Sequence, residues 1–205
     1  MAERGNLFVI AAPSGAGKTS LVNALVDSLE KIQVSISHTT RMPRPGEEHG
    51  VNYYFISKRD FEQEIAQGHF LEYAIIFESL YGTSKTWVEK TLDEGIDVIL
   101  EIDWQGYHQI KKMLPSAIGV FILPPSLEAL KERLVGRQQD SMAVIEKRLQ
   151  DAQTTISHVK EFDYVVVNDD FDQTLKDLSV IIAASRLSKT SQVERHSGLL
   201  KALLE

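Results

Sequence analysis

LFVIAAPSGAGKTS, residues 7–20, is the stretch of the sequence that decides the fold. It opens with a short apolar run and ends in Gly-Lys-Thr-Ser, and apolar residues then recur with helical spacing from Leu21 to Leu29. This order predicts a buried strand, a tight turn of small residues and an amphipathic helix. The backbone N–H groups of such a turn, with the positive end of the helix, bind phosphate oxygens. The stretch therefore predicts a P-loop, in which Lys18 reaches the β- and γ-phosphates of a nucleoside triphosphate and the Thr19 hydroxyl ligates Mg²⁺.

One position departs from the general P-loop pattern G-x-x-x-x-G-K-[ST], because Ala12 stands where the pattern has its first glycine. The rest of the motif still follows a predicted strand and precedes a predicted helix, which is the context that it needs. A turn that binds nothing would need neither the lysine nor the two adjacent hydroxyls. The residues predicted to bind the triphosphate are Ala12, Pro13, Ser14, Gly15, Ala16, Gly17, Lys18, Thr19 and Ser20.

Length and composition limit the class of protein. With 205 residues, of which 43% are hydrophobic and 25% charged, the chain suits one α/β domain with smaller inserted lobes. It has no cysteine, which excludes disulfides and thiolate metal sites, and the spacing of its six histidines indicates no metal site. A net charge of −7 argues against a nucleic-acid polymer as partner. With no signal segment and no apolar run long enough for a bilayer, we expect a cytoplasmic protein without a membrane partner; the oligomeric state stays open.

Short β-branched runs separated by helical patterns predict buried parallel strands joined by helical crossovers. These runs are Leu7–Ala11, Val98–Ile102, Val120–Leu123 and Tyr164–Val167. The predicted fold class is therefore α/β, with a parallel sheet flanked by helices.

Two segments differ from this core in their pattern of polar and apolar residues. Residues 34–95 alternate polar and apolar side chains around a Pro/Gly loop, which predicts an inserted lobe with a small, partly antiparallel sheet and two helices. Residues 127–159 predict two cation-rich helices joined by a polar turn, as in a movable lid. The core would then comprise residues 1–33, 96–126 and 160–190, and residues 191–205 would form a C-terminal tail.

The densest group of polar residues lies at residues 37–53. Arg41 and Arg44 flank a turn stiffened by prolines, and Tyr53 returns on the next predicted strand. Arginine offers a planar fork of donors and tyrosine a neutral donor, so the three can converge on one phosphate. Two arginines alone could equally form a solvated basic turn; the P-loop and Tyr53 favour the phosphate site.

This segment resembles the guanylate kinase family of nucleoside monophosphate kinases, in its bacterial type. The pattern T-T-R-x-P-R-x-G-E-x-x-G-x-x-Y-x-F is matched at residues 39–55, after Ser37. FLEYA at residues 70–74, YGTS at 81–84 and IDWQG at 102–106 follow in the family's order. The chain departs from many members at Thr83, Glu101 and Trp104, but none of these departures removes a functional group.

The resemblance implies a P-loop core with a GMP-binding lobe and a helical lid, and transfer of the ATP γ-phosphoryl group to GMP or dGMP with Mg²⁺ as cofactor. It assigns GMP to Ser37, Arg41, Arg44, Tyr53, Glu72, Tyr81, Thr83 and Asp103. It assigns catalysis to Lys18, Arg41, Arg133, Arg137 and Arg148, and Asn168 to the neighbourhood of the adenine of ATP. The Watson–Crick edge of guanine presents two hydrogen-bond donors beside one acceptor. Carboxylates can accept from the two donors, and hydroxyls can donate to the acceptor.

Two other functions remain open. One is a catalytically inactive, guanylate-kinase-like module that holds phosphopeptides; the complete Gly-Lys-Thr at residues 17–19 argues against it. The other is a P-loop kinase that acts on a phosphorylated sugar, which would have no use for Glu72 and Asp103 beside the arginine-rich lobe.

Overall fold

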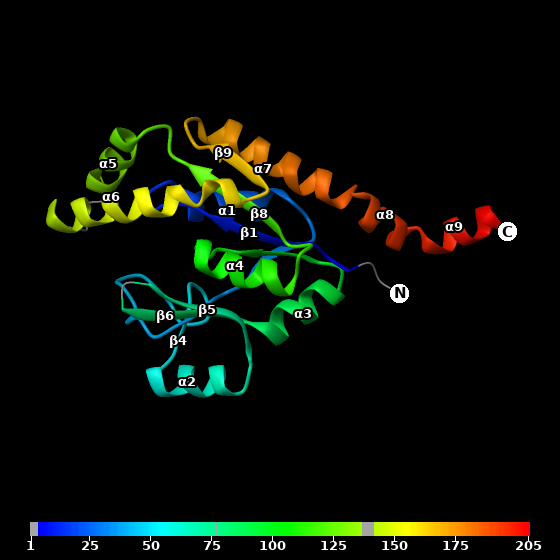
Figure 1. Cartoon of the computed structure of the whole chain (residues 1–205), viewed down its shortest axis with the longest axis horizontal. Helices are drawn as coiled ribbons and strands as arrows, with labels where there is room; N and C mark the ends of the chain where they lie inside the picture. Colours follow the sequence, from blue (N-terminus) through cyan, green and yellow to red (C-terminus); the bar gives the residue numbers. More distant parts are fainter. Residues whose placement is uncertain (1–3, 77, 137–141) are drawn as a thin grey trace.

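The computed structural model describes residues 4–76, 78–136 and 142–205 (Figure 1). Its central element is a five-stranded sheet in the order β2-β7-β1-β8-β9, and all its neighbouring strands are parallel. The strands are β1 (Leu7–Ala11), β2 (Ile32–Val34), β7 (Asp97–Leu100), β8 (Ile118–Leu123) and β9 (Tyr164–Val167). The predicted α/β class with a parallel sheet is confirmed.

Helices cover both faces of this sheet because β1 is apolar at every position and points successive side chains to opposite faces. Phe8 and Ile10 pack with α1 (Lys18–Ser28) and α7 (Phe171–Arg186). Leu7 and Val9 pack on the other face with α3 (Lys85–Asp93) and α4 (Trp104–Met113). β1 therefore contributes to two cores and is fully buried.

A second sheet, in the order β4-β3-β6-β5, lies in the inserted segment and is partly antiparallel. Its strands are β3 (His38–Thr39), β4 (Tyr54–Phe55), β5 (Phe70–Ile76) and β6 (Ser79–Ser84), and α2 (Lys58–Ala66) packs on it. Phe61 of α2 lies 4.5 Å from Phe70, ring centroid to ring centroid. Val34 lies in β2 of the central sheet and not in this lobe, because residues 32–34 pair with β7.

The segment predicted as a lid contains α5 (Leu127–Gly136) and α6 (Met142–Ser157), which pack on each other around Leu130, Leu134 and Ile145. A 3-10 turn, η1 (Val159–Glu161), leads back to β9. Arg137 lies outside the described residues.

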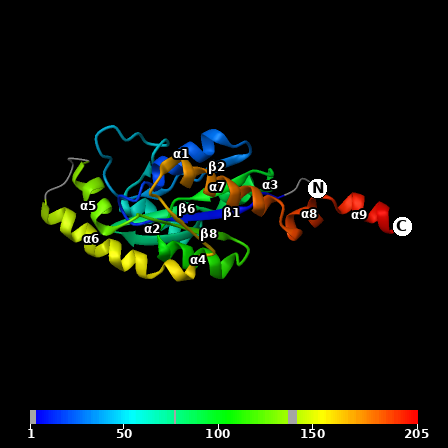
Figure 2. The same ribbon diagram turned by 90° about the horizontal axis from the view of Figure 1, so that it is seen from above.

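The chain ends in α8 (Lys189–Arg195) and α9 (Ser197–Leu204), which run from the end of α7 away from the two sheets (Figures 1 and 2). None of the helices in the described ranges is long and apolar enough to cross a membrane.

Candidate active site

The loop between β1 and α1 has the backbone that phosphate binding requires. Gly15 and Gly17 have φ angles of +93° and +91°, which residues with a side chain rarely adopt. Gly17 is the N-cap of α1, without a side-chain cap or an acidic residue in the first turn, so no side chain of this turn competes with a bound anion for the N-terminal N–H groups. Ala12 is not among the described residues with positive φ, so the position does not need the glycine of the general pattern.

Lys18 and Thr19 share one carboxylate partner. The Thr19 hydroxyl donates to Glu101 Oε2 at 3.0 Å, and Lys18 Nζ lies 3.9 Å from the same oxygen. Glu101 directly follows β7, whose C-terminal end lies beside that of β1 because the two strands are parallel and adjacent. Burial lowers the pKa of Lys18, and the carboxylates of Glu101 and Asp103 oppose this shift.

Asn168, which follows β9, lies beneath the loop. Its Nδ2 donates to the Ala16 carbonyl at 2.7 Å, and the side chain is buried. A Cβ atom on Gly17 would lie 2.5 Å from that nitrogen, so only glycine fits there. The Asn168 carbonyl accepts from Arg133 Nη2 at 2.9 Å. Asn168 thus supports the loop from behind, and does not line the cavity described below.

In the lobe, Arg41 is held by three acceptors. Its Nη2 donates to Glu47 Oε1 at 2.8 Å, its Nε to the Tyr81 hydroxyl at 3.2 Å and its Nη1 to the Met42 carbonyl at 2.9 Å. Glu47 Oε2 also accepts from the backbone N–H of Arg44 at 2.8 Å, which fixes the turn between the two arginines. The hydrogen bond to Arg41 lowers the pKa of Glu47, so this carboxylate remains ionised.

Glu72 is a buried carboxylate at the other end of the lobe. The pairing of β5 with β6 shifts register between Phe70 and Glu72, and this irregularity buries Leu71 and Glu72 side by side. Glu72 Oε1 accepts from the Thr83 hydroxyl at 2.6 Å. Burial raises the pKa of Glu72 to about 7, the Thr83 hydrogen bond opposes this shift, and the charge of Asp103 adds to it.

Asp103 is half-buried at the start of α4 and has a structural role there. It is the N-cap of α4, where Oδ1 accepts from the Gly106 N–H at 3.0 Å and Oδ2 accepts from Gln105 Nε2 at 3.0 Å. A Cβ atom on Gly106 would lie 2.7 Å from Glu72 Oε2. The first turn of α4 therefore packs directly against the Glu72 carboxylate.

One cavity of about 570 Å³ brings these groups together. From the P-loop it is lined by Ala12, Pro13, Ser14, Gly15, Gly17, Lys18 and Thr19. From the lobe and α4 it is lined by Ser37, Arg44, Tyr53, Glu72, Tyr81 and Asp103, and from α6 by Arg148. Six other predicted site residues do not line it: Ala16, Ser20, Arg41, Thr83, Arg133 and Asn168.

Two carboxylates in the site were not predicted as site residues. Glu101 holds Lys18 and Thr19, and its position directly after an apolar strand, two residues before Asp103, was the available signal. Glu47 holds Arg41 across a turn, and the family pattern that fixes Glu47 and leaves Glu48 open was the available signal.

A parallel α/β sheet, a P-loop at the end of its central strand and a second polar site across the same cavity define the P-loop NTPase class of fold. A family model described as guanylate kinase matches residues 4–185. The chain belongs to the guanylate kinase family.

Similarity extends over the whole chain. Guanylate kinases of Alcanivorax borkumensis and Saccharophagus degradans are 56% and 53% identical to it, over 100% of this chain and 99% and 100% of the relatives. The crystal structure of guanylate kinase from Anaplasma phagocytophilum has a TM-score of 0.77 at 32% identity, and the match covers 92% of this chain and 90% of that one.

Proposed function

We propose that this chain transfers the γ-phosphoryl group of ATP to GMP, giving ADP and GDP, and that it accepts dGMP as well. One observation carries the proposal: a single cavity is lined by Lys18 and Thr19 and also by Glu72 and Asp103. Relatives of similar length and a solved structure, all named guanylate kinase, support the same reaction.

Guanine is recognised by the pair Glu72 and Asp103. The carboxylates accept from the N1–H and 2-amino groups of the base, while the hydroxyl of Ser37 serves the O6 edge. Thr83 donates its single hydroxyl proton to Glu72 at 2.6 Å and so orients that carboxylate; it can serve the O6 edge only when this proton turns away from Glu72. Adenine presents the reversed pattern, and each buried group left unpaired costs about 1–3 kcal/mol, so two mismatches give strong selection.

The phosphate of GMP is bound by Arg41, Arg44, Tyr53 and Tyr81. Arg41 and Tyr81 are already joined at 3.2 Å, which supports a common target. The attacking phosphate oxygen is ionised at neutral pH, so no general base is needed. The task of these residues is to hold that oxygen in line with the γ-phosphorus atom.

The triphosphate of ATP lies along the P-loop, and Lys18 follows the γ-phosphoryl group as it moves. Thr19 Oγ1 and Glu101 Oε2 are oxygen donors 3.0 Å apart, a set that fits Mg²⁺, and we assign Thr19 as its protein ligand. When bound, Mg²⁺ supplies charge neutralisation at the β- and γ-phosphate oxygens. We place the adenine near the segment of Asn168, whose side chain holds the loop.

The lid supplies further positive charge. Arg148 faces the cavity, and Arg133 has a buried Nη1 atom without a hydrogen-bond partner among the described residues, which supports an anionic partner. We assign Arg133, Arg137 and Arg148 to the phosphates, with residues 127–159 closing over ATP and the lobe that follows β2, residues 35–95, closing over GMP. Closure excludes water, which would otherwise hydrolyse ATP. We place this activity in the cytoplasm.

The test is a coupled assay of ADP formation from ATP with GMP, dGMP, AMP, UMP and a sugar phosphate as rival acceptors. In the presence of ATP, we expect fast turnover with GMP and dGMP and with none of the other acceptors. Fast turnover with a sugar phosphate would assign the second kinase class, and phosphopeptide binding without turnover would assign the inactive binding module.

A further inference from the structure

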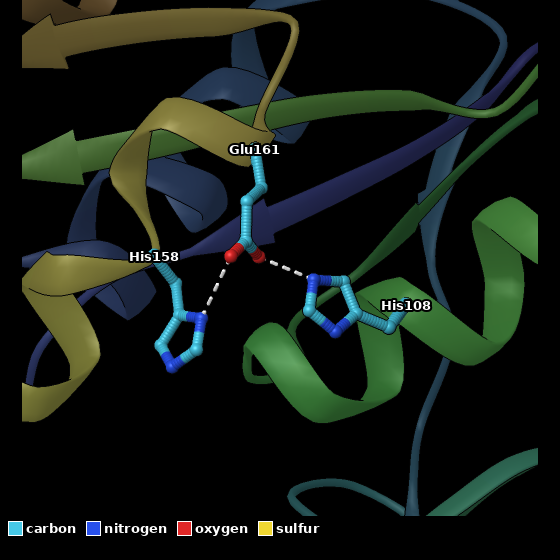
Figure 3. Close-up of side chains that lie close together, drawn as sticks. All are labelled: His108, His158 and Glu161. Carbon is cyan, nitrogen blue, oxygen red and sulfur yellow. Dashed lines mark hydrogen bonds and ion pairs between the residues drawn. The ribbon is translucent and has the colours of Figure 1, made fainter.

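Outside the cavity, His108, His158 and Glu161 meet where the lid returns to the core (Figure 3). His108 lies in α4, His158 follows the last residue of α6, and Glu161 ends η1. A hydrogen bond of 3.0 Å joins His158 Nδ1 to Glu161 Oε1, and His108 Nε2 contacts the other carboxylate oxygen. Each residue offers one ligand atom, and the three atoms lie within 4.8 Å of one another.

The cluster is both held in place and open to solvent. The ring of His158 stacks on Trp104 with centroids 3.6 Å apart and planes 7° apart, which fixes its orientation. The side chains of His108, His158 and Glu161 are 38%, 22% and 42% exposed, so an ion can enter from solvent. The proposed phosphoryl transfer uses none of these three residues.

We propose that His108, His158 and Glu161 form a binding site for one divalent transition-metal ion, with Zn²⁺ as the best fit. Two imidazole nitrogens and one carboxylate oxygen are a set that zinc accepts, with a fourth position left for water. Imidazole favours zinc, nickel, cobalt and copper, whereas Mg²⁺ prefers oxygen ligands. The ion would take the place of the protons that Glu161 now shares with the two histidines.

The site joins two elements that the lid connects. His158 and Glu161 belong to the return from α6, whereas His108 belongs to α4, whose first residue, Trp104, lines the active-site cavity. A bound ion would tie the end of the lid to α4. We therefore expect Zn²⁺ to lower turnover, a consequence that rests on the proposed lid motion, whereas the binding itself does not.

The experiment is a titration of the tag-free, nucleotide-free protein with ZnCl₂, followed by calorimetry and by tryptophan fluorescence. We expect one ion per chain, a fluorescence change from Trp104 and a higher melting temperature with zinc. His108→Ala and His158→Ala should each weaken binding at least about tenfold. The matched control is His69→Ala, because His69 also pairs with a carboxylate, Glu64 at 2.9 Å, but belongs to no group of three possible metal ligands within the described ranges.

Two further variants keep the outcome decisive. The Trp104→Phe variant should still bind zinc in the calorimeter but should lose the fluorescence change. If a histidine variant fails to fold, Glu161→Gln takes its place, because it replaces the carboxylate with a neutral group of equal size; it too should bind zinc more weakly than the wild-type protein. The proposal is overturned if the wild-type protein binds no zinc at one ion per chain. It is also overturned if the His108 and His158 variants bind zinc as tightly as His69→Ala does, or if MgCl₂ binds equally well.

Discussion

Asn168 donates from Nδ2 to the carbonyl of Ala16 at 2.7 Å, across 152 positions of the sequence. The bond satisfies a carbonyl in the middle of the P-loop and fixes the direction of the N–H groups on the opposite side. The segment after β9 thus supports the proposed ATP site without contributing a residue to the cavity wall.

Asn168→Ala should therefore raise the KM for ATP about tenfold and leave the KM for GMP nearly unchanged. The variant leaves the Ala16 carbonyl unpaired and should lower the free energy of unfolding by about 1–3 kcal/mol. Steady-state kinetics with each substrate varied in turn would measure the two KM values, and urea unfolding would measure the free energy of unfolding. Asn6→Ala is the control, because Asn6 bonds to Asp97 far from the loop; an equal rise in the KM for ATP there would contradict the assignment.

Lys18→Met should lower kcat on the order of 10³-fold or more, while GMP still binds, because Lys18 serves the triphosphate and not the acceptor. Turnover and GMP affinity should be measured separately, the latter by calorimetry. Near-normal turnover would show that the P-loop assignment is wrong.

The pH dependence of GMP binding should follow Glu72. Burial raises its pKa to about 7, and only the ionised form accepts from both guanine donors. The KM for GMP should therefore rise about tenfold as the pH falls from 8 to 6. In Glu72→Gln this rise should shrink to the part that comes from the GMP phosphate itself, whose pKa is about 6; an unchanged pH profile in the variant would contradict the role of Glu72.

The same shift affects stability. An unfolded glutamate has a pKa of about 4.3, so between about pH 4.5 and 7 the folded protein holds a proton that the unfolded chain has lost. The contribution of Glu72 to the free energy of unfolding must then fall as the pH rises through this window and stay constant above it. Urea titrations of wild-type protein and Glu72→Gln across this range should show the difference. A wild-type contribution that grows with pH would exclude the raised pKa.

Gly106→Ala tests the contact between α4 and Glu72. Alanine normally stabilises a helix by about 1 kcal/mol relative to glycine, but here its Cβ would lie 2.7 Å from Glu72 Oε2. We expect the KM for GMP to rise about tenfold or more, with the KM for ATP unchanged. Gly198→Ala in α9 meets no atom within 4 Å and should leave both constants unchanged. A normal KM for GMP in Gly106→Ala would mean that Glu72 does not bind the base.

The bounds of β1, β8 and β9 could be predicted closely, because each strand is a continuous apolar run. β1 and β8 lie between parallel neighbours, but β9 is an edge strand with three of its four residues exposed, so the prediction that it is buried is wrong. β2 was missed, since it has only three residues and one of them is exposed. β5 was also missed as a strand, because the irregularity at Leu71 and Glu72 buries two successive side chains and breaks the alternation that identifies a strand.

The residues of the site also fall into those that could be predicted from the sequence and those that could not. The P-loop is local in sequence, so Gly15, Gly17 and Lys18 could be predicted together. The contact between His108 and Glu161 joins residues 53 positions apart, and no spacing of histidines could have indicated it. The support of the P-loop by Asn168 depends on the position of β9 in the sheet, which a single sequence does not specify.

The lid helices have an apolar cluster of their own, formed by Leu130, Leu134, Ile145 and Ala152 and separate from the two cores that share β1. Amides of β1 lie between the paired strands β7 and β8, and its side chains fill both cores, so these amides should exchange with solvent only when the whole domain unfolds. Amides of α5 and α6 should instead exchange together and earlier, as a second cooperative unit. The proposed opening of the lid during turnover would then leave the amides of the central sheet protected from exchange.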